Sequence, residues 1–189
     1  MEKEYWDNRW VNKELGWDIG KVSKPLKEYF DTLEDKSIKI LIPGAGNGYE
    51  AEYLHNKGFT NVFVADISEH ALQSFMERCP GFPKEHTINK DFFKLEEKYD
   101  LIIEQTFFCS MYPSRRIDYA QKMKSLLKKD GKLVGVLFDR SFDAGPPFGG
   151  CKEDYMKVFG VVFDHVDMVP CKNSIKERMG TELWFEAKN

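Results

Sequence analysis

From residue 38 onward, short apolar runs alternate with stretches in which apolar residues recur at helical spacing. The apolar runs are continuous, as expected for parallel strands that are covered on both faces. An alternation of strands and helices predicts a doubly wound α/β sheet with right-handed crossovers. We expect strands at 38–43, 61–66, 86–89, 99–105 and 132–139, and helices at 49–57, 69–79 and 114–128, the last ended by Gly131.

The pattern changes after a glycine- and proline-rich stretch at 145–150. A short helix is expected at 152–159, followed by two strand-like runs at 161–168 and 182–187 with a polar loop between them. Two late strands joined without a helix pair antiparallel. The sequence therefore predicts a seven-stranded, mostly parallel sheet with an antiparallel C-terminal hairpin and helices on both faces.

Length and composition predict one globular domain over residues 1–189, with an N-terminal aromatic segment at 1–37 and a core at 38–189. A net charge of −3 gives no electrostatic reason to expect nucleic acid or a membrane surface as a partner. Without a signal peptide or a long apolar run, the chain is expected to be cytoplasmic. The four cysteines are far apart, which favours free thiols over a zinc site. We expect a monomer that binds a small-molecule substrate.

Three alternating glycines, Gly44, Gly46 and Gly48, follow the first strand and precede a helix. Glycines at such a turn let the backbone approach a ligand that a Cβ would block. Asp66 closes the second strand at about 20 residues' distance, where a carboxylate can accept hydrogen bonds from ribose hydroxyls. Together they predict a pocket for an adenosine-containing cofactor.

The glycine spacing differs from the dinucleotide fingerprint, since Tyr49 takes the place of its third glycine. The tighter spacing suits S-adenosylmethionine, whose methionyl end replaces the diphosphate. Two other classes stay open at this point. One is a nicotinamide-dependent oxidoreductase, and the other is a module that binds S-adenosylmethionine without catalysis.

Further candidate residues follow the other strands, because ligands in open α/β sheets bind beyond the carboxyl ends of the strands. Asp91 could bind the adenine amino group, or could serve only as a turn residue. Gln105 could bind the methionyl part, or could simply end a strand. Phe107 could wall the pocket or belong to the core. The remaining cofactor-side candidates in these loops are Ile67, Lys90 and Phe92.

Trp6 and Trp10 are spaced i, i+4 and share one helix face, and Trp17 follows them. This segment could be a mobile lid over the cofactor, or an amphipathic helix docked on the sheet. The four histidines form no catalytic constellation, and no paired carboxylates stand out. The chemistry is therefore expected to come from the cofactor, with the protein supplying position and electrostatics.

These motifs resemble the thiopurine S-methyltransferase superfamily, which includes halide and thiol methyltransferases. The matching stretches are 6–10, 16–20, 42–48, 65–68, 99–109 and 145–148. The resemblance implies a class I methyltransferase, Rossmann-like fold and S-adenosylmethionine as cofactor, with S-adenosylhomocysteine as product and no metal. By matching motif, it implies that the cofactor is bound by Trp6, Trp10, Gly44, Asp66, Asp91 and Gln105. It places Trp17 facing the substrate.

Two departures separate this chain from the thiopurine enzymes. Gln105 stands where they carry an arginine, and Gly44-Ala45-Gly46 replaces a leucine-cysteine-glycine turn. Both features resemble the halide and thiol branch. We expect in-line methyl transfer to a thiol, bisulfide, thiocyanate or halide, without a general base. Candidates for the substrate pocket are Trp10, Trp17, Phe108, Phe138 and Phe148, and Arg140 could attract an anionic substrate or be a solvated loop residue.

Overall fold

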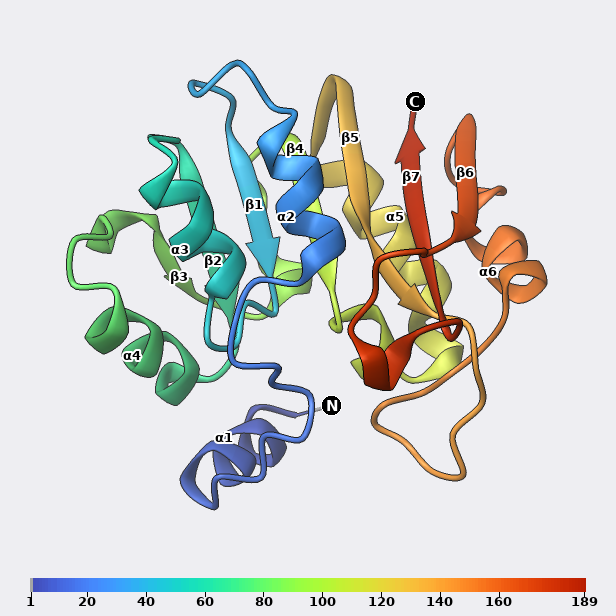
Figure 1. Cartoon of the computed structure of the whole chain (residues 1–189), viewed down its shortest axis with the longest axis horizontal. Coiled ribbons are helices and arrows are strands. Elements are labelled where there is room, and N and C mark those ends of the chain that lie inside the picture. Colours follow the sequence, from blue (N-terminus) through green and yellow to red (C-terminus); the bar gives the residue numbers. More distant parts are fainter. Residues whose placement is uncertain (1) are drawn as a thin grey trace.

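The computed structural model describes residues 2–189, whose strands all belong to one sheet of order β3-β2-β1-β4-β5-β7-β6 (Figure 1). The strands are β1 (Ile40–Pro43), β2 (Val62–Asp66), β3 (Thr87–Asn89), β4 (Tyr99–Gln105), β5 (Leu127–Phe138), β6 (His165–Pro170) and β7 (Glu182–Lys188). The α-helices are α1 (Lys3–Val11), α2 (Lys24–Asp31), α3 (Tyr49–Asn56), α4 (Glu69–Arg78), α5 (Arg116–Leu126) and α6 (Lys152–Phe159).

The pairing of the strands confirms the predicted architecture. Strands β1 to β5 pair in parallel, and β7 lies antiparallel between β5 and β6. The chain runs outward from β1 to β3, then returns to β4 on the other side of β1. This reversal places the carboxyl ends of β1 and β4 side by side, the usual location of a ligand crevice in such sheets.

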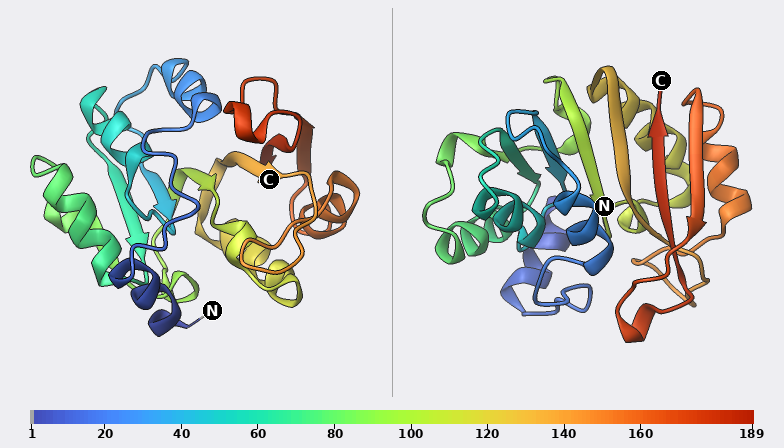
Figure 2. Two further views of the ribbon diagram at one scale, coloured as in Figure 1. Left: turned by 60° about the horizontal axis from the view of Figure 1, so that its bottom comes forward. Right: turned by 45° about the horizontal axis from the view of Figure 1, so that its top comes forward.

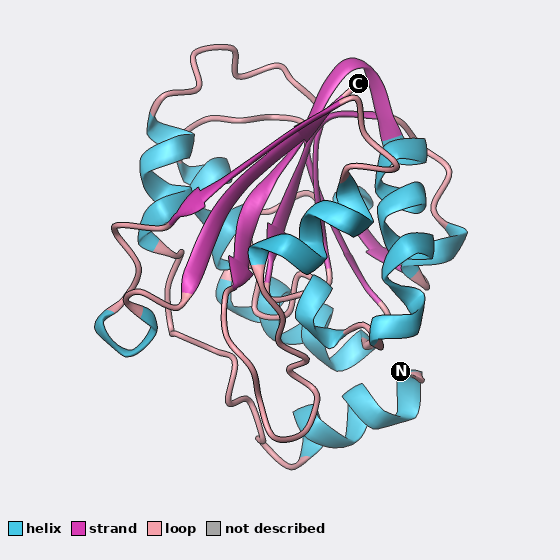
Figure 3. Cartoon of the chain, turned by 90° about the vertical axis from the view of Figure 1, so that its right-hand side faces the viewer, coloured by secondary structure: helices cyan, strands magenta, loops and turns pink. Residues whose placement is uncertain are grey.

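Alternate residues of each central strand feed two separate hydrophobic cores. In β1, Ile40 and Ile42 pack on the side of α2, α3 and α4, whereas Leu41 packs on the side of α5 and α6. Side chains on a strand alternate between the two faces, so a continuously apolar strand is needed when both faces are covered. Figure 3 shows these helices on either side of the strands.

Several local features differ from the sequence-based expectation. Helix α2 was not predicted, although Ser23 and Pro25 provide an N-terminal signal and Leu26 and Phe30 are fully buried. The helix expected at 114–128 is α5, which spans Arg116–Leu126, and Gly131 does not cap it because the chain passes directly into β5. Residues 128–131 bulge out of β5 there, since Leu127 and Lys132 pair with Tyr99 and Leu101.

The strand expected at 161–168 begins later, at His165. Residues 160–163 instead form a turn that ends α6, with the Phe163 N–H donating to the carbonyl of Phe159 at 2.8 Å. Val161 is 74% exposed there, so its apolar character does not indicate a buried strand. Within the described chain, no helix has the length and apolar character required to cross a bilayer.

The carboxyl ends of the parallel strands carry most of the irregular structure. Helix α1 and the long loop between β5 and α6 both lie at this edge and stand apart from one another (Figure 2). Helix α1 buries none of its side chains in the core. It is tied to the start of α4 by a hydrogen bond of 2.7 Å from the Ser68 hydroxyl to Asp7 Oδ1.

Candidate functional site

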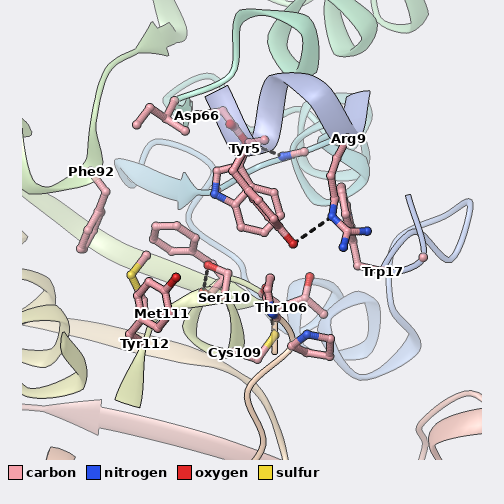
Figure 4. A pocket seen from close by; sticks show the side chains of 18 of the residues that line it. Tyr5, Arg9, Trp17, Asp66, Phe92, Thr106, Cys109, Ser110, Met111 and Tyr112 are labelled. Atoms are coloured by element: carbon pink, nitrogen blue, oxygen red, sulfur yellow. Dashed lines mark hydrogen bonds between the residues drawn. The ribbon is translucent and has the colours of Figure 1, made fainter. Parts of the chain in front are cut away.

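A cavity of about 1100 Å³ opens at the carboxyl ends of the parallel strands (Figure 4). Its walls come from α1, the turns after β1 and β3, the ends of β2, β4 and β5, the loop between β5 and α6, and the loop between β6 and β7. Most residues selected from the sequence line it. They are Trp6, Trp10, Trp17, Gly44, Gly46, Asp66, Ile67, Lys90, Asp91, Phe92, Phe138 and Arg140.

The Asp66 carboxylate is oriented by backbone groups on both sides. Its Oδ2 accepts from the Gly46 N–H at 3.0 Å, and its Oδ1 accepts from the Ser68 N–H at 2.9 Å. Each carboxylate oxygen can accept a second hydrogen bond, so the carboxylate retains acceptor capacity at the cavity it lines. Burial raises the pKa of Asp66, and the N–H groups of Ser68 and Gly46 partly oppose that rise.

The three glycines after β1 have different roles. Gly46 lies beside the cavity, where a Cβ would sit 3.7 Å from Trp17 Nε1 and would narrow the space next to the tryptophans. Gly44 makes room for the ring of Phe107. Gly48 does not line the cavity. With φ of +63°, it begins α3, and a Cβ there would lie 2.5 Å from the ring of Phe75, so it permits close packing of α3 on α4.

The turn after β3 places Asp91 and Phe92 at the cavity wall. Asp91 Oδ1 accepts from the Phe93 N–H at 3.0 Å, which fixes the carboxylate at the start of a short 3-10 turn. The Phe92 ring is nearly buried and packs edge-on against Phe107, with ring centroids 5.2 Å apart. The turn therefore presents an acid beside an apolar ring, a combination suited to a purine edge and face.

The three N-terminal tryptophans form one cluster. The Trp17 ring meets Trp6 at 5.6 Å and Trp10 at 6.4 Å, both edge-on. The segment that carries Trp17 is held from two directions. Asp18 accepts a hydrogen bond from Asn47 in the glycine turn, and the Trp17 carbonyl accepts from Arg178 Nη2 at 3.1 Å.

Gln105, Phe108 and Phe148 are absent from the residues that line the cavity. Gln105 Oε1 accepts from the Ser23 hydroxyl at 3.0 Å and so supports the segment that enters α2. Phe108 is 1% exposed and packs in the core between the rings of Tyr119 and Tyr155. Phe148 lies behind residues that line the cavity: its ring packs against Tyr112 at 5.2 Å, and its N–H donates to the Cys109 carbonyl at 2.6 Å. We leave all three, together with Gly48, out of the proposed contact set.

A buried glutamate shapes the end of β4. Glu104 Oε1 accepts from the N–H groups of Phe107 and Phe108, each at 2.8 Å, and the Tyr119 hydroxyl donates to Oε2. Thr106, just before them, has a φ of +58°, a left-handed conformation that non-glycine residues adopt at a cost. Burial raises the pKa of Glu104 to about 7, although these donors favour its ionised form.

Several residues of the cavity had no distinguishing signal in the sequence. Arg178, in the loop before β7, stacks over Phe138 at 5.2 Å, and Arg140 stacks over Phe142 at 4.8 Å. They come together only because β7 lies beside β5 and brings its preceding loop to the same edge. The other additions include Tyr5, Arg9, Thr106, Cys109, Ser110, Met111, Tyr112 and Arg115.

Among the described residues that line the cavity, few side chains are suited to transfer a proton near pH 7. No histidine lines it. Cys109 is 8% exposed and donates to the Thr106 carbonyl at 3.1 Å. Burial raises the pKa of its thiol to about 12, so Cys109 is a neutral thiol near pH 7 and a poor nucleophile. Among residues 2–189, no three His, Cys, Asp or Glu side chains are arranged to bind a metal ion.

Comparison with known sequences links this chain to methyl transfer. The family model for thiopurine S-methyltransferase (TPMT) matches residues 1–182. A probable thiol methyltransferase 2 from Arabidopsis thaliana is 30% identical, and the match covers 94% of this chain and 81% of the relative. Thiocyanate methyltransferase 1 from Brassica oleracea is 29% identical, with coverages of 96% and 83%.

Solved structures share the fold. A 1,6-didemethyltoxoflavin N1-methyltransferase from Burkholderia thailandensis, with bound 1,6-didemethyltoxoflavin and S-adenosylhomocysteine, matches with a TM-score of 0.77 at 14% identity, over 99% of this chain and 87% of that one. A magnesium protoporphyrin IX methyltransferase from Synechocystis PCC 6803, with bound S-adenosylmethionine, matches with a TM-score of 0.73 at 13% identity, over 99% and 95%.

Proposed function

The chain belongs to the thiopurine S-methyltransferase family and is an S-adenosylmethionine-dependent methyltransferase, and we propose that it methylates small, soft nucleophiles that are already anionic near neutral pH. The acceptors we have in mind are thiolates, bisulfide, thiocyanate and halides. The family match gives no support to a nicotinamide oxidoreductase or to a non-catalytic module, the alternatives that the sequence alone left open.

The residues of the cavity fit S-adenosylmethionine. The missing Cβ at Gly46 leaves the glycine turn open to the cavity, and Asp66 still has lone pairs for two ribose hydroxyls. We propose that Asp91 accepts from the adenine amino group and that Phe92 packs against the ring. Lys90 and Ile67 complete the adenosine end, and Trp6 and Trp10 cover it.

S-Adenosylmethionine, when bound, supplies an activated methyl group that a nucleophile displaces in line. The protein's part is then to align the acceptor and to keep water away. Trp10, Trp17 and Phe138 give the acceptor end an apolar, aromatic wall, and Arg140 provides a positive charge at its rim. Removing water from a large soft anion costs less free energy than removing it from a small hard anion, so such an anion can enter an apolar site.

One observation carries the choice of acceptor. The titratable side chains at the cavity include no histidine, and its one thiol is held protonated. The carboxylates of Asp66 and Asp91 are both engaged with backbone N–H groups, and the other carboxylates at the cavity, those of Glu2, Glu4 and Glu177, are exposed to solvent. A site of this kind has no evident base for a neutral alcohol or amine, whose pKa is far above 7, but can align an anion that arrives ionised.

The test is a panel of acceptors with production of S-adenosylhomocysteine as the readout. Thiocyanate, iodide, bisulfide and aryl thiols should react faster than phenols, catechols and amines. For aryl thiols at fixed saturation, the rate should rise with pH until the thiol is ionised and then level off. A catechol or an amine as the best acceptor would show that a base has been overlooked.

A further inference from the structure

Tyr5 and Arg9 form a hydrogen-bonded pair on the cavity face of α1. They are one helical turn apart, both line the cavity, and Arg9 Nε donates to the Tyr5 hydroxyl oxygen at 3.0 Å. Figure 4 shows the two side chains and the bond between them among the residues that surround the cavity. Neither residue has a part in the proposed cofactor contacts.

The direction of this hydrogen bond is unambiguous. A guanidinium group only donates, so the Tyr5 oxygen is the acceptor. Arg9 is itself held from the other side, because its Nη1 donates to the Glu14 carbonyl at 3.4 Å and lies 3.7 Å from the Glu14 carboxylate. The contacts with Glu14 therefore hold the Arg9 guanidinium in place as the donor to the Tyr5 hydroxyl oxygen.

The proton of the Tyr5 hydroxyl has no acceptor within residues 2–189. A phenol whose oxygen accepts from a cation is polarised and becomes a stronger donor. The Thr106 and Ser110 hydroxyls also line the cavity but donate to backbone carbonyls, whereas Tyr5 is a donor without a partner among the described residues. Its natural partner is an atom of a ligand that accepts hydrogen bonds.

We propose that Tyr5 orients the methyl acceptor by donating to its hard end, so that its soft atom is left to face the methyl group. The inference rests on the proposed function. It applies to two-ended nucleophiles, in which a nitrogen or oxygen acceptor accompanies a soft sulfur. A hydrogen bond lowers the reactivity of the atom that accepts it, so a donor is useful at the non-reacting end. Tyr5 thereby favours such ions over spherical halides, which have no second atom to hold.

The experiment compares thiocyanate with iodide in the wild-type protein and in the Tyr5→Phe variant. The variant keeps the ring and removes only the hydroxyl. We expect kcat/KM for thiocyanate to fall about tenfold, the usual effect of one lost hydrogen bond to an ion, and kcat/KM for iodide to change by less than about twofold. Tyr53→Phe is the matched control, because Tyr53 lies outside the cavity and donates to Asp31. Equal losses for both ions, or no loss for thiocyanate, would overturn the inference.

Arg9 is a positioning residue in this scheme and has its own readout. Arg9→Met keeps the aliphatic stem and removes the donor to Tyr5. Alone, it should reproduce part of the thiocyanate-specific loss. In the Tyr5→Phe background it should add almost nothing, because the two residues act through one hydroxyl. Additive losses would show that Arg9 acts independently of Tyr5.

Equilibrium binding separates this inference from the proposed function. Calorimetry of thiocyanate and of iodide, each titrated into the S-adenosylhomocysteine complex, needs no turnover. A wild-type protein that methylates neither ion, nor bisulfide or an aryl thiol, would contradict the proposed function. In that case, a thiocyanate affinity that drops in Tyr5→Phe while the iodide affinity holds would still support the role of Tyr5. Absence of saturable thiocyanate binding, or an equal drop for both ions, would refute it.

Discussion

The ring of Phe107 occupies the space that a side chain on Gly44 would need: an added Cβ would lie 2.3 Å from Phe107 Cδ2. The two residues belong to neighbouring strand ends, after β1 and β4. The Phe107 N–H is bound by Glu104, so the position of the ring follows from a buried carboxylate. The close packing of the glycine turn against the end of β4 therefore depends on glycine at position 44 and on the Phe107 ring held by Glu104.

Gly44→Ala should disturb both strand ends. It combines a left-handed backbone, with φ of +59°, with a clash against Phe107, and we expect a loss of about 2–4 kcal/mol in the free energy of unfolding. Gly58→Ala is the control, because φ there is +86° but nothing lies within 4 Å of the added Cβ. It should cost only the strain of a left-handed backbone, about 1–2 kcal/mol. Urea denaturation measures both. Equal losses would mean that the Phe107 contact is unimportant.

Asp66→Asn should weaken binding of S-adenosylhomocysteine by about 10- to 100-fold, since a charged acceptor of ribose hydroxyls is lost. The amide keeps an oxygen for only one of the two backbone N–H groups, so a loss of about 1–3 kcal/mol in the free energy of unfolding is expected alongside and is measured separately by urea denaturation. Asp164→Asn, on an exposed side chain far from the cavity, should have no effect. Because burial raises the pKa of Asp66, the wild-type affinity should decrease as the pH falls and the carboxylate becomes protonated. Calorimetry that finds unchanged affinity in Asp66→Asn would refute the ribose assignment.

Glu104 should make the stability of the protein fall as the pH rises from about 4.5 to about 7. Its pKa is about 7 in the folded state against a usual 4.5, so the folded state binds more protons than the unfolded state in that window. The full difference corresponds to about 3 kcal/mol. Glu104→Gln keeps an acceptor for Phe107 and Phe108 and should remove this slope. Urea denaturation at several pH values tests it, with Glu97→Gln on the surface as control.

Hydrogen exchange across residues 3–20 should slow when S-adenosylhomocysteine is added. Helix α1 buries no side chain in the core, and its link to α4 rests on the Ser68 to Asp7 hydrogen bond. A ligand placed against Trp6 and Trp10 would add the missing contacts. Ser68→Ala should speed exchange in α1 of the free protein and leave the strands unaffected. Exchange that is the same with and without ligand would favour a permanently docked helix.

The fold was predictable because its signals are local. Continuous apolar runs such as Ile40–Pro43 indicate strands with two covered faces, and the glycine turn and Asp66 mark the same edge of the sheet. The predicted boundary between the helix at 114–128 and the strand at 132–139 was wrong, because α5 passes into β5 without a loop. Gly131 interrupts an apolar pattern as a helix end would, yet it lies in a bulge of β5 that only pairing with β4 reveals.

The sequence predicted the residues of the candidate site that directly follow a parallel strand, and it missed most of the others. Phe108 lies three residues beyond the end of β4, and a short 3-10 turn directs its ring into the core rather than to the cavity. Arg178 lies in the loop before β7, far along the chain from the glycine turn and Asp66. The antiparallel pairing of β7 with β5 brings this loop to the cavity. Tyr5 becomes a candidate only because its hydroxyl accepts a hydrogen bond from Arg9 and its side chain lines the cavity. Such relationships depend on tertiary approach and leave no pattern along the chain.

The order of the strands divides the cavity between two halves of the sheet. Apart from Trp6 and Trp10 of α1, the proposed cofactor residues lie at the ends of β1, β2 and β3. Phe138 at the end of β5, Arg140 after it and Arg178 before β7 lie on the other side of the reversal between β1 and β4. Exchanging the loops at 139–150 and 171–181 among relatives would alter the acceptor end without touching any proposed cofactor contact. In such an arrangement, acceptor preference can diverge through loop exchange while one cofactor is retained, and chimeras of these loops are a direct route to new acceptors.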